Sequence, residues 1–145
     1  MEQINSLFLT DGYKTGHHKM YPENTTFVYS NFTPRSNKYA PGGCDMLLNV
    51  GQQLLMKKIH NHFNDNFFSQ PVEVVCEEMK EEMEMYLGGT YEVSHFIRLH
   101  EAQCLPIEVK ALEEGYLVPM RVPTLTVSNT TPLAGVVFHW ITNYL

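Results

Sequence analysis

The strongest constraint on the fold is a four-residue repeat of apolar side chains that begins after Gln52. The residues that recur at this interval are Leu55, Ile59, Phe63 and Phe67. Residues four apart lie on one face of an α-helix, because the helix completes a turn in about 3.6 residues. The sequence therefore predicts a helix from Gln52 that buries this face.

Two further helices are predicted downstream. Pro71 is favourable at a helix N-terminus, and Gly88-Gly89 stops a helix. The apolar stripe between these signals consists of Val72, Val75, Met79, Met83 and Tyr86 or Leu87. Five glutamates between Glu77 and Glu84 largely cover the remaining surface, and we interpret them as a solvated helix face rather than a cation site or an acid–base pair. The third helix is expected over residues 93–102.

Short strands are predicted on both sides of these helices. Aromatic and β-branched content or alternation indicates strands at residues 27–32, 45–50, 107–111, 116–119 and 124–127. Residues 40–43 form a break and residues 113–115 a turn. A brief helix or turn is expected through His17 to Tyr21, ahead of Pro22. The fold class is therefore a mixture of α and β structure.

The last residues form an apolar and aromatic segment. Residues 129–131, followed by Pro132, indicate the entry to a helix. Residues 133–145 then include Phe138, Trp140 and Tyr144. Such a helix leaves a large apolar face without a partner. The chain is either a piece of a longer protein, which we favour, or it docks on another subunit through this helix.

Composition limits the class of protein. The 145 residues suffice for one domain, and the net charge of -6 argues against a general nucleic-acid binder. The three cysteines stand far apart without a CxxC pair. No signal peptide or apolar stretch of about 20 residues occurs, so we expect no membrane span and a cytoplasmic location with reduced thiols.

The residues with the most chemical potential lie between Thr10 and Lys38. Tyr13 is either a flat surface for stacking a planar ring or a packing residue under a loop. Arg35 either binds phosphate oxygens through two parallel hydrogen bonds or is a solvated loop cation. Lys38 is likewise either a phosphate-binding or a solvated cation. Spacing alone favours the structural interpretation for all three.

Other catalytic or metal-binding patterns are weak. His17 and His18 point apart on a helix, and His60 and His62 share a face only on a strand. No carboxylate or cysteine completes either pair at metal-ligand spacing, so no metal site is predicted. The sequence also lacks a Gly-rich nucleotide loop, a nucleophile elbow and the acidic pair with phosphate cradle that many phosphoribosyltransferases use. These residues provide ligand contacts without a complete catalytic set.

A series of motifs follows in order along the chain. The first motifs are Thr10-Asp11-x-Tyr13-Lys14, His17, Tyr21-Pro22, Thr25-Thr26-x-Val28-Tyr29-Ser30 and Arg35. The later ones are Leu105-Pro106-Ile107-Glu108-Val109-Lys110-Ala111-Leu112-x-Glu114-Gly115-Tyr116-x-Val118-Pro119 and Leu125-x-Val127-x-Asn129-Thr130. Together they resemble the N-terminal portion of nicotinamide phosphoribosyltransferases, in the superfamily that also contains the nicotinate enzymes. The motifs are sparse from about residue 40 to residue 102.

The resemblance implies an α/β fold of a particular kind. It implies the α+β N-terminal domain of a type II phosphoribosyltransferase, with short antiparallel strands and packed helices. Residues 1–145 would form this single domain and end before the α/β barrel on which it packs. The resemblance also implies head-to-tail homodimers with active sites at the dimer interface.

The resemblance also implies an activity and site residues. The family makes nicotinamide mononucleotide and pyrophosphate from nicotinamide and phosphoribosyl pyrophosphate, a salvage step toward NAD. Tyr13 is expected to stack on the nicotinamide ring of the neighbouring subunit, beside Asp11. Arg35 is expected to reach the phosphate end of the ligand, also across the interface. Lys38 is a substrate-binding candidate from its own charge and is not part of the resemblance. Mg2+ is implied with phosphoribosyl pyrophosphate.

Several parts of the family's site would lie beyond residue 145. These parts are a second aromatic, the aspartate that selects amide over acid, the barrel arginines and a phosphorylatable histidine. The chain alone is therefore not expected to be catalytically complete. The alternatives are a non-catalytic module that docks on a full-length enzyme, or part of a nicotinate phosphoribosyltransferase.

Overall fold

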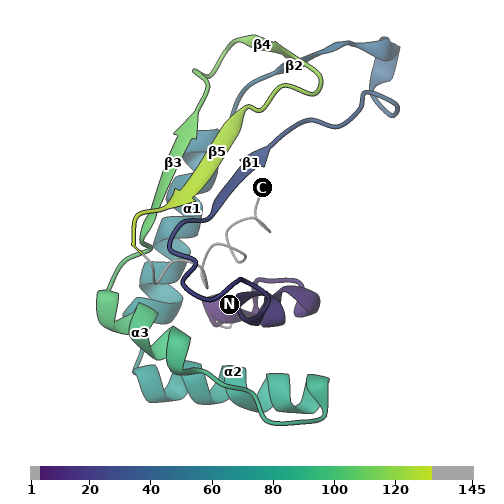
Figure 1. The fold of residues 1–145 in the computed structure, drawn as a ribbon. Helices are drawn as coiled ribbons and strands as arrows, with labels where there is room; N and C mark the ends of the chain where they lie inside the picture. The colour runs from purple at the N-terminus through teal and green to yellow at the C-terminus, as the bar shows by residue number, and fades with distance from the viewer. Residues whose placement is uncertain (1–3, 132–145) are drawn as a thin grey trace.

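The computed structural model describes residues 4–131, which contain two small antiparallel sheets and three α-helices joined by shorter helical turns and loops (Figure 1). The larger sheet has the order β1-β5-β3 and contains β1 (Tyr29–Phe32), β3 (Ile107–Ala111) and β5 (Leu125–Asn129). The smaller sheet pairs β2 (Met46–Leu48) with β4 (Leu117–Pro119). The mixed α/β class is confirmed, and each predicted strand region contains a strand.

The predicted helix after Gln52 is confirmed as α1 (Gln52–Phe63). It continues into a one-turn π-helix, η4 (Asn64–Phe68), which places both Phe67 and Phe68 in the core. Ile59 and Phe63 are also buried, while Leu55 packs against their cluster from a partly buried position. Figure 1 shows α1 along one side of the larger sheet, where Met56 of α1 and Leu125 of β5 line one cavity.

The other two helices form the opposite end of the molecule from β2 and β4 (Figure 1). Helix α2 (Val72–Leu87) starts after Pro71 and ends at Gly88, whose φ of 71° is left-handed. Helix α3 (Ser94–Ala102) starts one residue later than predicted. The apolar stripe of α2 is buried at Val75 and Met79, whereas its last members, Tyr86 and Leu87, remain exposed.

The N-terminal segment packs on these helices through 3-10 turns. The first, η1 (Ser6–Phe8), lies beside α2, and the side chain of Asn5 donates to the carbonyl oxygen of Val75. The second, η2 (Gly12–Lys19), begins five residues before the predicted His17. Its eight residues form an unusually long 3-10 helix, since such runs rarely exceed three or four residues.

The predicted helix entry at residues 129–132 is wrong at its first residue. Asn129 ends β5, pairs with Ile107 and accepts a hydrogen bond from the backbone N–H of Val28. Its side-chain amide donates to the carbonyl oxygens of Thr26 and Thr131. The same amide that favours a helix cap therefore joins two strand ends here. The predicted helix over residues 133–145 lies outside the described residues.

Candidate ligand-binding surfaces

Tyr13 projects from η2 with 64% of its surface exposed. The ring centres of Tyr13 and His17 lie 5.5 Å apart, and the two ring planes meet at 59°. Nζ of Lys14 lies 5.8 Å from the centre of the Tyr13 ring. The ammonium is within cation–π range of an aromatic face. An exposed ring with an adjacent cation provides a surface on which a planar ligand can stack.

Asp11 contributes to the same surface through Lys14. Its carboxylate lies 3.8 Å from Nζ of Lys14, and the lysine side chain is only 13% exposed. The Asp11 carbonyl oxygen also accepts from the Lys14 backbone N–H at 2.9 Å, which closes the first turn of η2. Asp11 thus positions the charge beside the tyrosine ring, and the structure brings Asp11 and Tyr13 together.

Arg35 and Lys38 occupy the loop that follows β1, and both are exposed. The Asn37 amide closes this loop by donating to Asp45 Oδ1 at 2.8 Å and to the Cys44 carbonyl oxygen at 3.0 Å. The Lys38 ammonium lies 5.3 Å from the ring centre of Tyr39. The structure therefore places the two predicted cations on one ordered loop, where an anion has open access to them.

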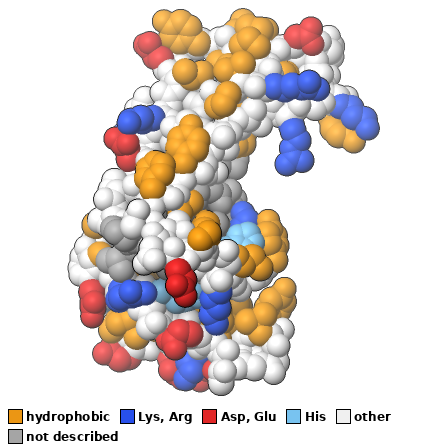
Figure 2. Space-filling view, viewed as in Figure 1, with side chains coloured by type: hydrophobic (Ala, Val, Ile, Leu, Met, Phe, Trp, Pro, Cys, Tyr) orange, Lys and Arg blue, Asp and Glu red, His pale blue; other side chains and the backbone are white. Residues whose placement is uncertain are grey.

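A third cation, Arg121, approaches the same loop from the other sheet. Its backbone N–H donates to the carbonyl oxygen of Pro34 at 2.8 Å, and its φ of 67° is left-handed. Figure 2 shows Lys and Arg side chains gathering at the upper right, over the loop that Figure 1 draws between β1 and β2. Sequence reasoning missed Arg121, because a single arginine after β4 carries no motif.

The two groups of predicted residues form separate surfaces. Segment η2, with Asp11 at its start and Tyr13, lies in the lower half of Figure 1. The loop with Arg35 and Lys38 lies at the upper right. Among the described residues, Asp11 and Tyr13 therefore form one surface, and Arg35 and Lys38 form another.

A cluster of aromatic and imidazole rings supports η2 from beneath. Tyr91 is 5% exposed, and its hydroxyl donates to the carbonyl oxygen of Thr15 at 3.0 Å. His18 and His95 stack with ring centres 4.3 Å apart. The pKa of His95 is lowered to about 3, mainly by burial and next by the nearby His18. Burial also lowers the pKa of His18. This cluster holds η2 and keeps His95 neutral at ordinary pH.

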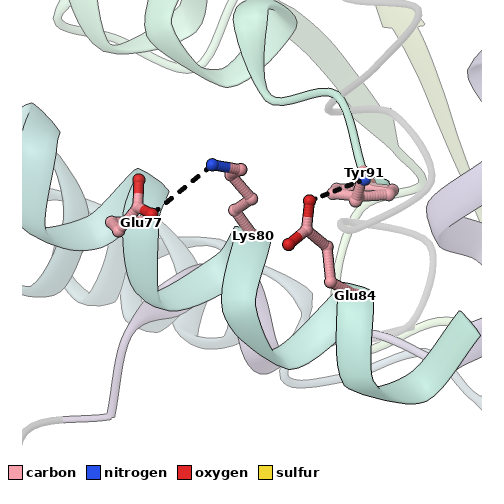
Figure 3. Close-up of polar contacts among 4 residues, drawn as sticks. All are labelled: Glu77, Lys80, Glu84 and Tyr91. Atoms are coloured by element: carbon pink, nitrogen blue, oxygen red, sulfur yellow. Dashed lines mark hydrogen bonds and ion pairs between the residues drawn. The ribbon is translucent and has the colours of Figure 1, made fainter. Parts of the chain in front are cut away.

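The glutamates of α2 have structural contacts. Glu77 pairs with Lys80 at 3.5 Å on the exposed helix surface. Glu84 accepts a hydrogen bond from the backbone N–H of Tyr91 at 3.2 Å (Figure 3). The run of acidic residues is thus partly a solvated face, as predicted, and partly an anchor for the segment that carries Tyr91.

Metal-ligand groups do not converge in the part of the chain that the structure describes. Within residues 4–131, no three His, Cys, Asp or Glu side chains gather at metal-binding distance. The described residues therefore do not offer a protein-only site for the Mg2+ that the resemblance implies. No helix in this same range is long and apolar enough to cross a membrane.

Two cavities adjoin the candidate surfaces. One of about 310 Å³ lies between η2 and α2, and Gly12, Thr15 and Met79 are among its lining residues. The other, of about 300 Å³, lies near the end of β1 and is lined by Gln52 and Thr124. Neither cavity contains Tyr13 or Arg35, so the predicted contacts lie on open surface.

The comparisons with known proteins agree with the motifs. No protein-family model matches the chain. The chain is 40% identical, over an alignment 152 positions long, to a protein of Acinetobacter baylyi named nicotinamide phosphoribosyltransferase. The alignment covers 99% of this chain and 28% of that relative. The resemblance is therefore confirmed, and it extends through the middle of the chain, where the motifs are sparse.

Proposed function

We propose that this chain is the N-terminal part of a nicotinamide phosphoribosyltransferase and that it supplies substrate contacts to an active site completed by other residues. The observation that carries the proposal is the 40% identity along 99% of the chain to a protein of that name. The exposed positions of Tyr13 and Arg35 support it, because both side chains are accessible to a ligand or another subunit.

The proposed reaction joins nicotinamide to a ribose carbon. The pyridine nitrogen forms a bond to the anomeric carbon of phosphoribosyl pyrophosphate. The bond from this carbon to the pyrophosphate oxygen breaks, and pyrophosphate leaves with the electron pair. Catalysis needs a ring held flat, a neutralised leaving group and an oxocarbenium-like carbon shielded from water.

The described residues fit the first two of these needs. Tyr13 offers a ring surface whose surroundings include the ammonium of Lys14 and the imidazole of His17. Arg35 and Lys38 offer positive charge for phosphate oxygens, and an arginine forms two parallel hydrogen bonds with such groups. We propose that residues outside this chain shield the oxocarbenium-like carbon from water.

The separation of the two surfaces supports a shared active site. A chain that contributes an aromatic surface at one end and cations at another requires further residues to enclose a ligand. We propose that a homodimer and a barrel domain provide them, with residues 1–145 as one N-terminal domain. Mg2+ would arrive with the pyrophosphate group. The free state of Cys44, Cys76 and Cys104 suits the cytoplasm, which we propose as the location.

The alternatives of a docking module and a nicotinate enzyme have less support. The apolar segment that motivated docking lies outside the described residues. The name of the relative specifies nicotinamide, the amide, rather than the acid. We therefore keep the amide-using enzyme as the proposal.

A complementation assay tests the proposed function. The chain is mixed with a form of the Acinetobacter baylyi relative that lacks the region matching it, and the copurified pair is called the complemented assembly. We expect it to form nicotinamide mononucleotide from nicotinamide and phosphoribosyl pyrophosphate, whereas either part alone does not. Absence of product from an assembly that does copurify contradicts the proposal. Product from nicotinate in place of nicotinamide supports the acid-using alternative.

A further inference from the structure

The eight-residue η2 needs anchors outside itself, because a 3-10 helix of this length is intrinsically unfavourable. Its three-residue period places Gly12, Thr15 and His18 on one face, and Tyr13 on a neighbouring face. Outside η2, the first face contacts Tyr86 of α2, Tyr91 of the following segment and His95 of α3. The inner face of η2 therefore sets the direction in which Tyr13 points.

The Thr15 carbonyl oxygen is the centre of this inner face. It accepts from the Tyr91 hydroxyl at 3.0 Å and lies 3.1 Å from Nδ1 of His18. A carbonyl oxygen only accepts, so Nδ1 of His18 carries the proton. The Thr15 hydroxyl in turn donates to the Gly12 carbonyl oxygen at 2.7 Å. One buried oxygen thus joins η2 to the loop before α3.

The other contacts restrict the same face. A Cβ atom on Gly12 would lie 2.8 Å from Cζ of Tyr86, so the backbone of η2 packs directly on that ring. His95 stacks on His18 and is only 4% exposed. Its Nε2 has no hydrogen-bond partner within the described residues. Tyr91 is therefore the group that hydrogen-bonds the inner face of η2 from the loop before α3.

We propose that Tyr91 is a positioning residue for Tyr13: its buried hydroxyl holds the Thr15 carbonyl oxygen and fixes the rotation of η2 that turns Tyr13 outward. The effect of Tyr91 on nicotinamide binding rests on the proposed function. Its effect on the rotation of η2 rests on the geometry alone. Burial raises the pKa of Tyr91 to about 12, so the hydroxyl stays a donor at ordinary pH.

The consequence of losing this hydrogen bond follows from helix geometry. A 3-10 helix advances about 120° per residue and an α-helix about 100°. Relaxation from one form to the other rotates Tyr13 relative to Thr15 by about 40° over two residues. The Tyr13 ring would then face a different direction without any change in the sheets.

Two measurements on Tyr91→Phe test the proposal, with Tyr116→Phe as the matched control. Tyr116 is exposed and directly precedes β4, which lies at the opposite end of Figure 1 from η2. In the full 145-residue chain, we expect Tyr91→Phe to move the amide NMR resonances of residues 12–19 and to leave those of β3 and β5 in place. Unchanged η2 resonances overturn the proposal, whatever the outcome of the activity assay.

The second measurement uses the complemented assembly. We expect Tyr91→Phe to raise the KM for nicotinamide about two- to tenfold, the range for lost aromatic stacking, and to leave the KM for phosphoribosyl pyrophosphate within about twofold. Equal increases in both constants indicate a general structural role and overturn the proposal.

A second variant separates the Tyr91 hydrogen bond from the hydrogen bonds inside η2. Thr15→Val removes the hydroxyl that bonds the Gly12 carbonyl oxygen and keeps the Thr15 carbonyl oxygen that Tyr91 holds. It should leave the KM for nicotinamide within about twofold, and an increase as large as that of Tyr91→Phe overturns the proposal. If the unaltered assembly makes no product, the proposed function fails, while the NMR result still decides the positioning role.

Discussion

At the scale of single residues, the two halves of the candidate site differ in how they are held. Tyr13 stands on a helix anchored by buried contacts, whereas Arg35 stands on an exposed loop closed by Asn37. An anchored aromatic loses little entropy when a flat ring stacks on it, because its backbone is already fixed. A loop cation depends more on charge, and its contribution should fall as salt increases.

Arg35 gives the first prediction. In the complemented assembly, Arg35→Ala should raise the KM for phosphoribosyl pyrophosphate by about tenfold or more, the cost of losing charge-assisted hydrogen bonds. Arg35→Lys should give a smaller increase, since lysine keeps the charge without the planar fork. Lys58→Ala, an exposed lysine on α1, is the control and should change nothing. Equal constants for Arg35→Ala and Lys58→Ala would exclude the phosphate role.

His95 gives a prediction about pH. Its pKa is about 3 in the folded chain and 6.5 for an unperturbed imidazole, because of burial, His18, Arg98 and Lys19, with Glu92 opposing. Between these values the unfolded chain binds a proton that the folded chain does not, so stability falls as pH falls below about 6.5. From pH 7 to 5.5 the loss should be about 1 kcal/mol.

Denaturant unfolding at the two pH values measures this effect. His95→Phe should reduce the pH dependence in that window, since phenylalanine binds no proton, and His18, whose pKa burial also lowers, should account for the remainder. His60→Phe, at an exposed position of α1, serves as the control for the loss of a histidine. The same slope in His95→Phe as in the unaltered chain would show that His95 is not the responsible group.

At the scale of elements, patterns within a helix or strand were predictable and contacts between elements were not. The four-residue repeat of Ile59 and Phe63 and the stop at Gly88 correctly predicted α1 and the end of α2. The position of Asn129 was not predictable, because its amide suits either a helix cap or a strand end.

The site shows the same limit of sequence reasoning. Tyr13, Asp11, Arg35 and Lys38 were chosen from motifs within one segment, and their functional roles stay predictions. Tyr91 and His95 lie more than 70 residues away from η2 in sequence, and their role depends on packing that no local pattern encodes. The polar atoms that meet at Thr15 are a tertiary feature, visible only in the folded chain.

The end of α2 gives a prediction at this scale. Gly88 has a φ of 71°, and no atom lies within 4 Å of the place that a Cβ atom would occupy, so an alanine there meets backbone strain alone. Gly88→Ala should lower the free energy of unfolding by about 1 kcal/mol. Gly89→Ala, with equal space and no left-handed φ, should change it by less than about 0.5 kcal/mol. Thermal unfolding of both variants measures the difference, and equal losses would contradict this explanation of the helix end.

At the scale of the whole molecule, the chain offers two surfaces at different ends and spans 28% of the relative that it matches. A single described chain does not enclose either Tyr13 or Arg35. The proposed assembly therefore predicts that activity depends on how many copies of this chain are bound to the rest of the enzyme.

The most direct measurement is the rate of nicotinamide mononucleotide formation as the chain is titrated into the form of the relative that lacks the matching region. We expect the rate to rise and saturate at one chain per partner. The Tyr13→Ala chain should bind to the same stoichiometry yet raise the KM for nicotinamide about two- to tenfold. A rate that does not depend on the added chain, despite complete binding, would contradict the central claim that this chain supplies part of the active site.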